Sequence, residues 1–169
     1  MLRILCSLFL LLALAGCDSG GDDDGGGDLA LGSMRAQIDG DGWTATNATA
    51  TDINVLGTRT LTIAGGQVGD AVSTVTVSIT AVDGAEITPG TYAIGDDATD
   101  LVFGTGSYSP DATMQQTFLS TSGSVTVDAI DDEGASGTFS FTAALPGSSD
   151  TIEVASGQFN VGFGPPIMP

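Results

Sequence analysis

Two clusters of acidic residues are the densest within residues 33–163 of this 169-residue chain, the part that we expect to fold as a domain. The first cluster consists of Asp96, Asp97 and Asp100, and the second of Asp128, Asp131, Asp132 and Glu133. Calcium prefers carboxylate and carbonyl oxygens, so either cluster could hold a Ca²⁺ ion, and the second is the better candidate. The more common arrangement for such a cluster is a solvated hairpin loop, whose charges keep the edges of a sheet from pairing with another chain.

A further group of acids lies in the run Asp39-Gly40-Asp41-Gly42. Together with Gln37, this run matches the early positions of an EF-hand calcium loop. However, the first ligand is then glutamine, and Ala48 stands where the loop needs its final glutamate. An Asp-Gly pair supplies the positive φ angles that a tight hairpin requires. The sequence therefore predicts a turn here.

The residue types on which most enzymes rely are scarce. The chain has no histidine, its three basic residues are all arginines, and its two cysteines, Cys6 and Cys17, lie near the N-terminus. This composition excludes Ser-His-Asp catalysis, Schiff-base chemistry on lysine and zinc sites built on histidine. A pair of carboxylates could hydrolyse a glycosidic bond, but a single tryptophan is too few aromatic residues for the cleft such a pair needs. We expect a protein that is not an enzyme, with a carboxylate-pair hydrolase as a distant alternative.

The aromatic residues offer little to a ligand. Trp43 is the only tryptophan, and an exposed tryptophan on a sheet could form a platform for a sugar. Its place in an alternating segment favours burial in the core instead. Tyr92 and Tyr108 are too far apart in the sequence to define an aromatic strip.

From Ser33 onward the hydrophobic pattern has a period of two. Residues 74–81, for example, alternate threonine or serine with valine, isoleucine or alanine, which is typical of a half-buried strand. The expected strands span residues 34–39, 43–51, 58–64, 72–82, 90–94, 101–105, 114–120, 124–130, 137–145 and 151–163. The pattern predicts an all-β fold, a single antiparallel β-sandwich or flattened barrel of about nine to ten strands.

The core of this fold should contain the inward-facing residues of the strands. These are Trp43, Leu61, Ile63, Val75, Val77, Ile79, Val125, Val127, Phe139, Phe141, Phe159 and Val161. In the last strand the apolar residues change from even to odd positions on either side of Gly157, which predicts a bulge or bend there. Residues 164–169, which are rich in proline, should form an unpaired tail.

The N-terminal segment has the pattern of a signal peptide. Arg3 precedes an almost unbroken apolar run, residues 4–15, which ends in small residues. This run is shorter than the roughly 20 apolar residues that span a bilayer. We expect residues 1–16 to be removed, which would take Cys6 with them.

The run Leu14-Ala15-Gly16-Cys17 resembles the lipobox of bacterial lipoproteins. The resemblance implies that the sulfur of Cys17 carries a diacylglyceryl group, that the preceding peptide bond is cut, and that the new N-terminus is acylated with a fatty acid such as palmitate. Two or three acyl chains hold a protein on a bilayer stably, whereas one does so only marginally. The bilayer is then the expected partner, bound through Cys17.

Residues 17–32 follow as a segment of glycine and aspartate with little to bury, and we expect a disordered tether. An acidic run behind the lipidated cysteine resembles the surface-export signal of Bacteroidota lipoproteins. In enterobacteria, by contrast, an aspartate at the position of Asp18 marks retention at the inner membrane. We expect a location in the cell envelope, at the outer membrane or cell surface.

The formal net charge of −18 narrows the choice of partners. So acidic a surface repels nucleic acid and anionic lipid headgroups. The charge fits either solvation in a salty habitat, where ions screen the carboxylates from one another, or the binding of divalent cations. The spread of the acids along the whole chain favours solvation.

Four short motifs within the expected domain, residues 33–163, carry a second resemblance. They are Ile38–Ala45 (I-D-G-x-x-W-T-A), Pro89–Tyr92 (P-G-T-Y), Ser136–Phe141 (S-G-T-F-S-F) and Gly157–Val161 (G-Q-F-N-V). Over residues 34–163 the chain resembles a family of small β-rich lipoproteins of the Bacteroidota type, whose domain has no known function. The resemblance implies an all-β lipoprotein domain, and it brings no known active site whose residues could be carried over.

The sequence thus predicts a membrane-anchored lipoprotein of the cell envelope whose domain is a binding or structural module. The alternative is a calcium-stabilised module for adhesion or glycan binding, in which the acidic clusters would hold the metal.

Overall fold

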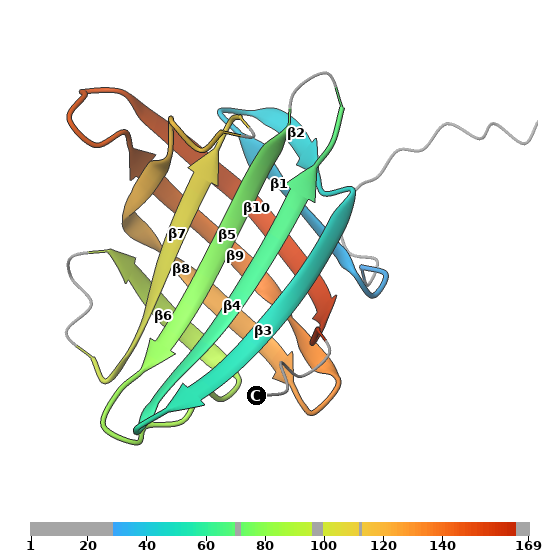
Figure 1. The fold of residues 1–169 in the computed structure, drawn as a ribbon, viewed down its shortest axis with the longest axis vertical. Helices are drawn as coiled ribbons and strands as arrows, with labels where there is room; N and C mark the ends of the chain where they lie inside the picture. Colours follow the sequence, from blue (N-terminus) through green and yellow to red (C-terminus); the bar gives the residue numbers. More distant parts are fainter. Residues whose placement is uncertain (1–28, 70–71, 96–99, 112, 165–169) are drawn as a thin grey trace, which may run out of the picture.

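The computed structural model describes residues 29–69, 72–95, 100–111 and 113–164 (Figure 1). Several predicted features lie outside these ranges: the expected signal peptide, Cys17, most of the expected tether, Asp96, Asp97 and residues 165–169 of the expected tail. The described residues form ten strands and no helix. The strands are β1 Ser33–Ile38, β2 Asp41–Thr44, β3 Asn47–Val55, β4 Thr58–Gln67, β5 Ser73–Ala81, β6 Gly90–Gly95, β7 Val102–Ser109, β8 Phe118–Ile130, β9 Gly134–Ala144 and β10 Thr151–Gly162.

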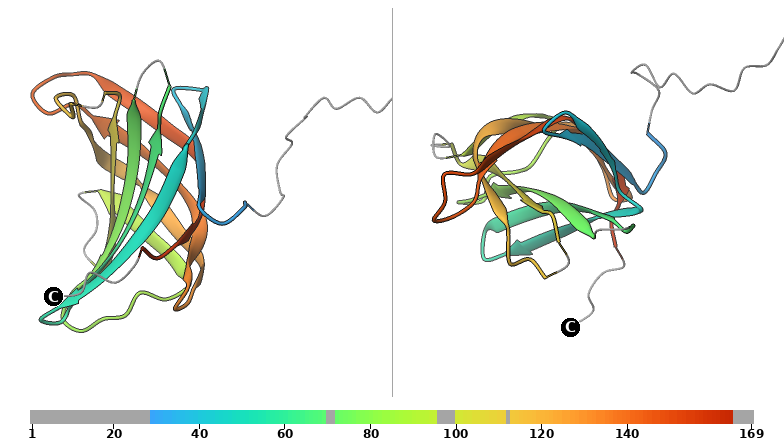
Figure 2. Two further views of the ribbon diagram at one scale, coloured as in Figure 1. Left: turned by 45° about the vertical axis from the view of Figure 1, so that its right-hand side comes forward. Right: turned by 90° about the horizontal axis from the view of Figure 1, so that it is seen from above.

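All ten strands belong to one sheet, in the order β2-β1-β10-β9-β8-β6-β7-β5-β4-β3. The sheet curls into a half-barrel, so that a front wall of β3, β4, β5 and β7 faces a back wall of β1, β10, β9, β8 and β6 (Figures 1 and 2). This confirms the predicted all-β class. One detail differs: β6 pairs in parallel with β7, at Ile94 and Gly104, because β6 is inserted between β7 and β8. The sheet is therefore mixed, although its other strand pairs are antiparallel.

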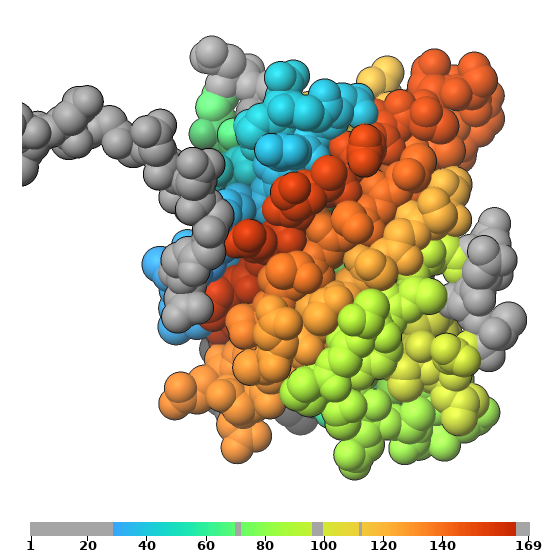
Figure 3. All heavy atoms as spheres, turned by 180° about the vertical axis from the view of Figure 1, so that it is seen from behind, coloured from blue at the N-terminus to red at the C-terminus, as the bar shows by residue number. Residues whose placement is uncertain are grey.

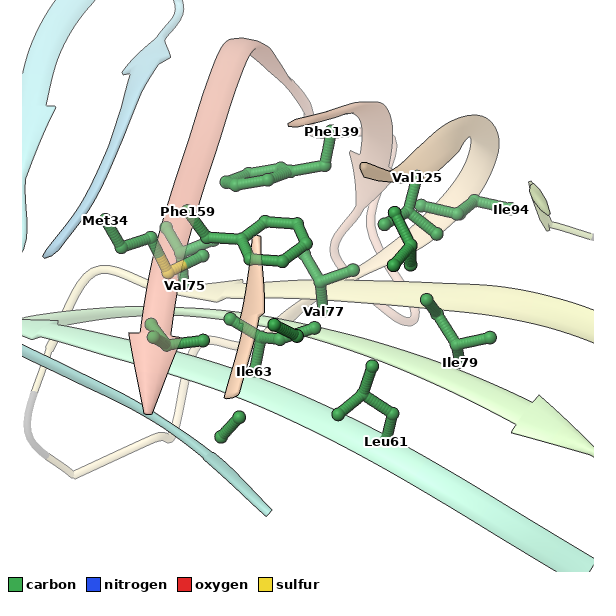
Figure 4. Packing of buried hydrophobic residues seen from close by; sticks show 14 of the residues in the cluster. Met34, Leu61, Ile63, Val75, Val77, Ile79, Ile94, Val125, Phe139 and Phe159 are labelled. Atoms are coloured by element: carbon green, nitrogen blue, oxygen red, sulfur yellow. The ribbon is translucent and has the colours of Figure 1, made fainter. Parts of the chain in front are cut away.

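The alternation seen in the sequence decides which face of each strand is buried. In β5 every second residue from Ser73 to Ala81 is buried, and the threonines and serine between them face outward. Phe139 and Phe159 of the back wall pack over Ile63, Val75 and Val77 of the front wall (Figure 4). All twelve residues predicted for the core are buried.

Several strand ends differ from the prediction by a few residues, and in two places the chain is divided into strands differently. The expected strand 43–51 divides into β2 and β3 because the chain changes partners at Ala45 and Thr46. The N–H of Ala45 donates to Met34 in β1, whereas that of Thr46 donates to Gly66 in β4. The two expected strands 114–120 and 124–130 form parts of one strand, β8, which has a shift in register near Thr121 rather than a turn.

The predicted bulge near Gly157 is present in β10. Between Val154 and Gly157 the strand has one residue more than β9 opposite it, and the pairing with β1 shifts at the same place. Ser156 accommodates the extra residue with φ of 51°. The shift moves the inward positions from Val154 to Phe159, as the change from even to odd apolar positions requires.

A substitution at Gly157 tests this packing. A Cβ atom at Gly157 would lie 2.5 Å from the ring of Phe139, whereas one at Gly42 would have no neighbour within 4 Å. We expect Gly157→Ala to lower the free energy of unfolding by about 1–3 kcal/mol, because the core would be overpacked. Gly42→Ala, the matched control, should change it by less than about 0.5 kcal/mol. Urea denaturation of both variants measures the difference, and equal stabilities would contradict the packing described.

Candidate functional site

The first described residues, Leu29–Gly32, join the domain beside the end of β10. The N–H of Gly32 donates to the carbonyl of Asn160 over 2.8 Å, and the side-chain amide of Asn160 donates to the carbonyl of Leu29 over 2.6 Å. The C-terminal end of β10 and the β8–β9 turn lie at this same end of the molecule (Figure 1). The segment that contains Cys17 is therefore connected to this end, which we call the tether end.

The acidic cluster predicted as the better metal site surrounds the β8–β9 turn, and all four of its side chains are exposed. One carboxylate oxygen of Asp131 accepts hydrogen bonds from the N–H groups of Glu133 and Gly134, at 2.8 and 3.0 Å. Within the described ranges, no three acidic, histidine or cysteine side chains are grouped so that they could hold a metal ion. The structure thus does not bring Asp128, Asp131, Asp132 and Glu133 together as a calcium site. Of the other cluster, only Asp100 is described, and it is exposed.

Asp131 is one of three aspartates in loops or turns whose side chains accept backbone hydrogen bonds. Asp39, in the predicted Asp-Gly turn between β1 and β2, accepts from the N–H of Glu153 over 2.8 Å. Asp39 and Gly40 have φ of 50° and 88°, as the predicted turn requires. Asp111 accepts from the hydroxyl and the N–H of Thr113, and the hydroxyl bond is the main reason that the pKa of Asp111 is lowered.

Trp43 lies in the core, as predicted, with 4 % of its surface exposed. Its indole N–H donates to the hydroxyl of Ser73 over 2.9 Å, which in turn lies 3.3 Å from the side-chain oxygen of Gln67. Burial so deep leaves no sugar platform at Trp43. The two tyrosines are half-buried: Tyr92 accepts a hydrogen bond from the N–H of Thr88 at the turn before β6, and burial raises the pKa of Tyr108.

The outer face of the back wall carries a feature that the sequence did not reveal. One residue from each of six neighbouring strands stands in register to form a polar row across the sheet. In order from β6 to β2, the row consists of Thr91, Thr126, Thr138, Gln158, Arg35 and Thr44. With strands about 4.8 Å apart, the row is about 24 Å long. Figure 3 shows the face that β6, β8, β9, β10 and β1 form side by side.

Hydrogen bonds already join neighbours within the row. The hydroxyls of Thr91 and Thr126 are 2.9 Å apart, and the guanidinium of Arg35 donates to the side-chain oxygen of Gln158 through Nη2 at 2.9 Å and Nε at 3.2 Å. Two open hollows of about 400 and 350 Å³ adjoin the row and share Ser156 and Gln158 at the bulge of β10. None of the described residues that line these two hollows is acidic.

Among the residues that the structure describes, the row and the linings of the two hollows thus contain no carboxylate, on a protein of net charge −18. Hydroxyl, amide and guanidinium groups at regular spacing can bind a ligand that offers hydroxyl or carbonyl groups along its length. No signal in the sequence separates these residues from the other outward-facing threonines, because only the register of six strands brings them into line.

The second basic side chain of the described residues, Arg59, lies on β4 and is also engaged. Its Nη2 is 2.6 Å from Oδ2 of Asp52 and its Nε is 3.0 Å from Oδ1. The hydrogen bond with Asp52 is the main reason that the pKa of Arg59 is raised. This ion pair holds the guanidinium of Arg59 against Asp52 of β3, so we do not assign Arg59 to a ligand site.

Residues 31–161 match a family described as a domain of unknown function, DUF6252. The chain belongs to the DUF6252 family. No curated protein and no solved structure matches it. The predicted resemblance to a family of unknown function is thereby confirmed, whereas the lipoprotein part of that resemblance stays a prediction.

The motifs behind the resemblance have clear places in this DUF6252 domain. Ile38–Ala45 forms the β1–β2 hairpin with Trp43, and Pro89–Tyr92 begins β6. Ser136–Phe141 lies in β9 and contributes two phenylalanines to the core. Gly157–Val161 follows the bulge of β10. The motifs therefore form the hairpin, parts of the core and the bulge. Each motif also contributes one residue to the polar row, namely Thr44, Thr91, Thr138 and Gln158.

Trp43 and Ser73 provide a test of the buried hydrogen bond. Ser73→Ala would leave the indole N–H without its acceptor in the core, so we expect a loss of about 1–3 kcal/mol in the free energy of unfolding. Ser78→Ala is the matched control on the same strand, since Ser78 faces outward and is half-buried. Denaturation can be followed through Trp43 itself, the only tryptophan. A loss as large in the control would show that the bond to Trp43 is not the cause.

Proposed function

We propose that this DUF6252 protein is a lipid-anchored protein of the cell envelope, attached through Cys17, and that its β domain is a binding or structural module without catalytic activity. The observation that carries the proposal is the run Leu14-Ala15-Gly16-Cys17 behind a short apolar segment with Arg3 before it. Export followed by lipidation of the cysteine accounts for all of these residues together.

The geometry of the domain supports this proposal. Residue 29 lies at the tether end, so that residues 17–28 connect Cys17 to that end. Twelve residues span at most about 40 Å, and the domain would therefore stay within this distance of the bilayer with its tether end directed toward it. Within the described part of the chain, no helix has the length and apolar character to cross a membrane.

A metabolic label tests the anchor. Cells that express the protein and are fed an alkyne-bearing palmitate analogue should yield a labelled protein in the membrane fraction, and Cys17→Ser should abolish both the label and the fractionation. Cys6→Ser is the matched control, because Cys6 lies in the segment expected to be removed. A Cys17→Ser protein that is labelled and fractionates like the parent would overturn the proposal.

The polar row favours a saccharide as the ligand of the module. A neutral oligosaccharide offers hydroxyl groups along an extended chain, which hydroxyls and amides at intervals of about 4.8 Å can bind. The described residues that line the two adjoining hollows include no acid, and their amide and hydroxyl groups are available to contact the ligand. This second candidate function needs neither a metal nor an exposed aromatic residue.

An array of neutral oligosaccharides tests this candidate. We expect binding to at least one linear oligosaccharide and a loss of affinity of about tenfold in Thr138→Val, which removes a hydroxyl from the middle of the row. Thr80→Val, on the outer face of the front wall, is the matched control and should bind as the parent does. Failure to bind any member of the array, or equal binding by both variants, would remove the saccharide candidate.

A further inference from the structure

The strand β3 forms one margin of the sheet, and half of it has no neighbour on its outer side. It pairs with β4 from Asn47 to Val55 without a shift in register. On the other side, in the described residues, the only β-type backbone pairing is a single parallel bridge between Ala50 and Phe163. All five residues beyond that bridge, Thr51–Val55, are exposed, and this part of β3 lies at the margin of the front wall in Figure 1.

The bridge shows which backbone groups face outward. The N–H of Gly164 donates to the carbonyl of Ala50 over 3.0 Å, so the carbonyl of Ala50 points away from β4. In an antiparallel pair the direction of the backbone groups alternates from residue to residue. The N–H and C=O groups of Asp52 and Asn54 therefore point outward as well, and they form an open template for one more strand.

The sequence does not allow the parallel pairing at Gly164 to continue regularly along this template. If the parallel pairing that begins at Gly164 continued, residue 166 would have to donate to the carbonyl of Asp52. Residue 166 is a proline, which has no N–H. The ladder is thus interrupted by the sequence at its first step beyond the bridge.

The side chains beside the template suit a strand from another protein. Ile53 and Val55 are 48 and 57 % exposed, and Leu56 at the tip of the hairpin is fully exposed. Proteins commonly protect an open edge with lysine, proline or a bulge, and Thr51–Val55 contains none of these. Its one charge, on Asp52, is compensated by Arg59 at 2.6 Å.

The charge around this edge indicates what kind of strand would bind. The β5–β6 loop, with Asp83 and Glu86, lies against the tip of the β3–β4 hairpin, since the N–H of Gly84 donates to the carbonyl of Gly57 over 2.9 Å. Glu86 is close enough to Arg59 to contribute to its raised pKa. A second copy of this chain, of net charge −18, would be repelled, whereas a basic partner would be attracted.

We propose that Thr51–Val55 is a docking edge to which an extended, basic segment of a partner protein adds as an eleventh strand. Backbone hydrogen bonds to Asp52 and Asn54 provide the attachment, as in other cases of strand addition. Ile53 and Val55 contact alternate side chains of the added strand, and its lysines or arginines face the neighbouring acids. The edge belongs to the folded domain, so that this proposal does not depend on lipidation of Cys17 or on the polar row.

The test uses the full-length chain in a mild detergent and the peptide acetyl-KTVTVTK-amide. Titration followed by NMR should shift the resonances of β3 and of no distant strand, and the affinity should fall as salt is added. Two control peptides separate the contributions. The same peptide with N-methyl groups on alternate residues cannot form the ladder, and acetyl-ETVTVTE-amide has the opposite charge. Neither should bind.

Variants of Asn54 make the test specific to the edge. Asn54→Pro removes an N–H that faces outward, so it takes no bond from β4, and it should weaken peptide binding by about tenfold or more. Asn54→Ala keeps the N–H and should bind within about twofold of the parent. Equal binding of the plain and N-methylated peptides, or unchanged binding by Asn54→Pro, would overturn the proposal. A dimer of the parent chain that Asn54→Pro abolishes would assign the edge to a second copy and overturn it as well.

Discussion

The apolar inner face of one large sheet can leave water only if the sheet folds back on itself. No helix in the described residues and no second sheet covers that face, so the front and back walls must cover one another. This constraint explains where the regular pattern of strands is interrupted. The chain changes partners at Ala45 and Thr46, where the two margins of the sheet meet, and Ser156 adds a residue to β10 where the back wall curves. Interruptions of this kind bend a strand and increase its twist.

Close packing between the walls also limits the size of the inward side chains. Gly104 and Gly106 lie on β7 at positions where a Cβ atom would come within 2.8 Å of Ile94 or Phe141. The large phenylalanines of the back wall therefore face small residues as well as the valines of the front wall. The alternation of large and small residues across the core is what allows a single domain without disulfides to reach native packing density.

Much of the fold could be predicted from the sequence, because a strand with one buried face has an apolar residue at every second position. The twelve core residues and the bulge near Gly157 follow from this alternation. The division of residues 43–51 into two strands could not be predicted, because both parts keep an alternating pattern and only hydrogen-bond partners distinguish them. The parallel pairing of β6 with β7 likewise depends on which strands meet, for which the pattern holds no information.

The candidate site residues differ in the same way: some can be predicted from neighbouring residues in the sequence, and others only from the pairing of distant strands. The turns at Asp39 and Asp131 were recognisable from the sequence, because an Asp-Gly pair favours positive φ and an aspartate such as Asp131 accepts backbone hydrogen bonds from residues two or three positions on. The polar row could not be recognised, because Arg35 and Gln158 are 123 residues apart in sequence and look like ordinary outward positions. Cys17 is the opposite case: its proposed chemistry is read from four consecutive residues and owes nothing to the fold.

The position of the open edge connects the two proposals. The residues Thr51–Val55 begin beside the end of β10, where Phe163 pairs with Ala50, and run from there toward the β3–β4 hairpin tip, away from the place where Leu29 joins the domain. A domain anchored through Cys17 would stay near the bilayer, because residues 17–28 span at most about 40 Å, while this edge would extend away from the attachment point. A free edge strand is a hazard for aggregation when molecules meet at random. Confinement beside a membrane, together with a strong negative charge on every copy, limits such encounters and leaves the edge available to a basic strand that reaches it there.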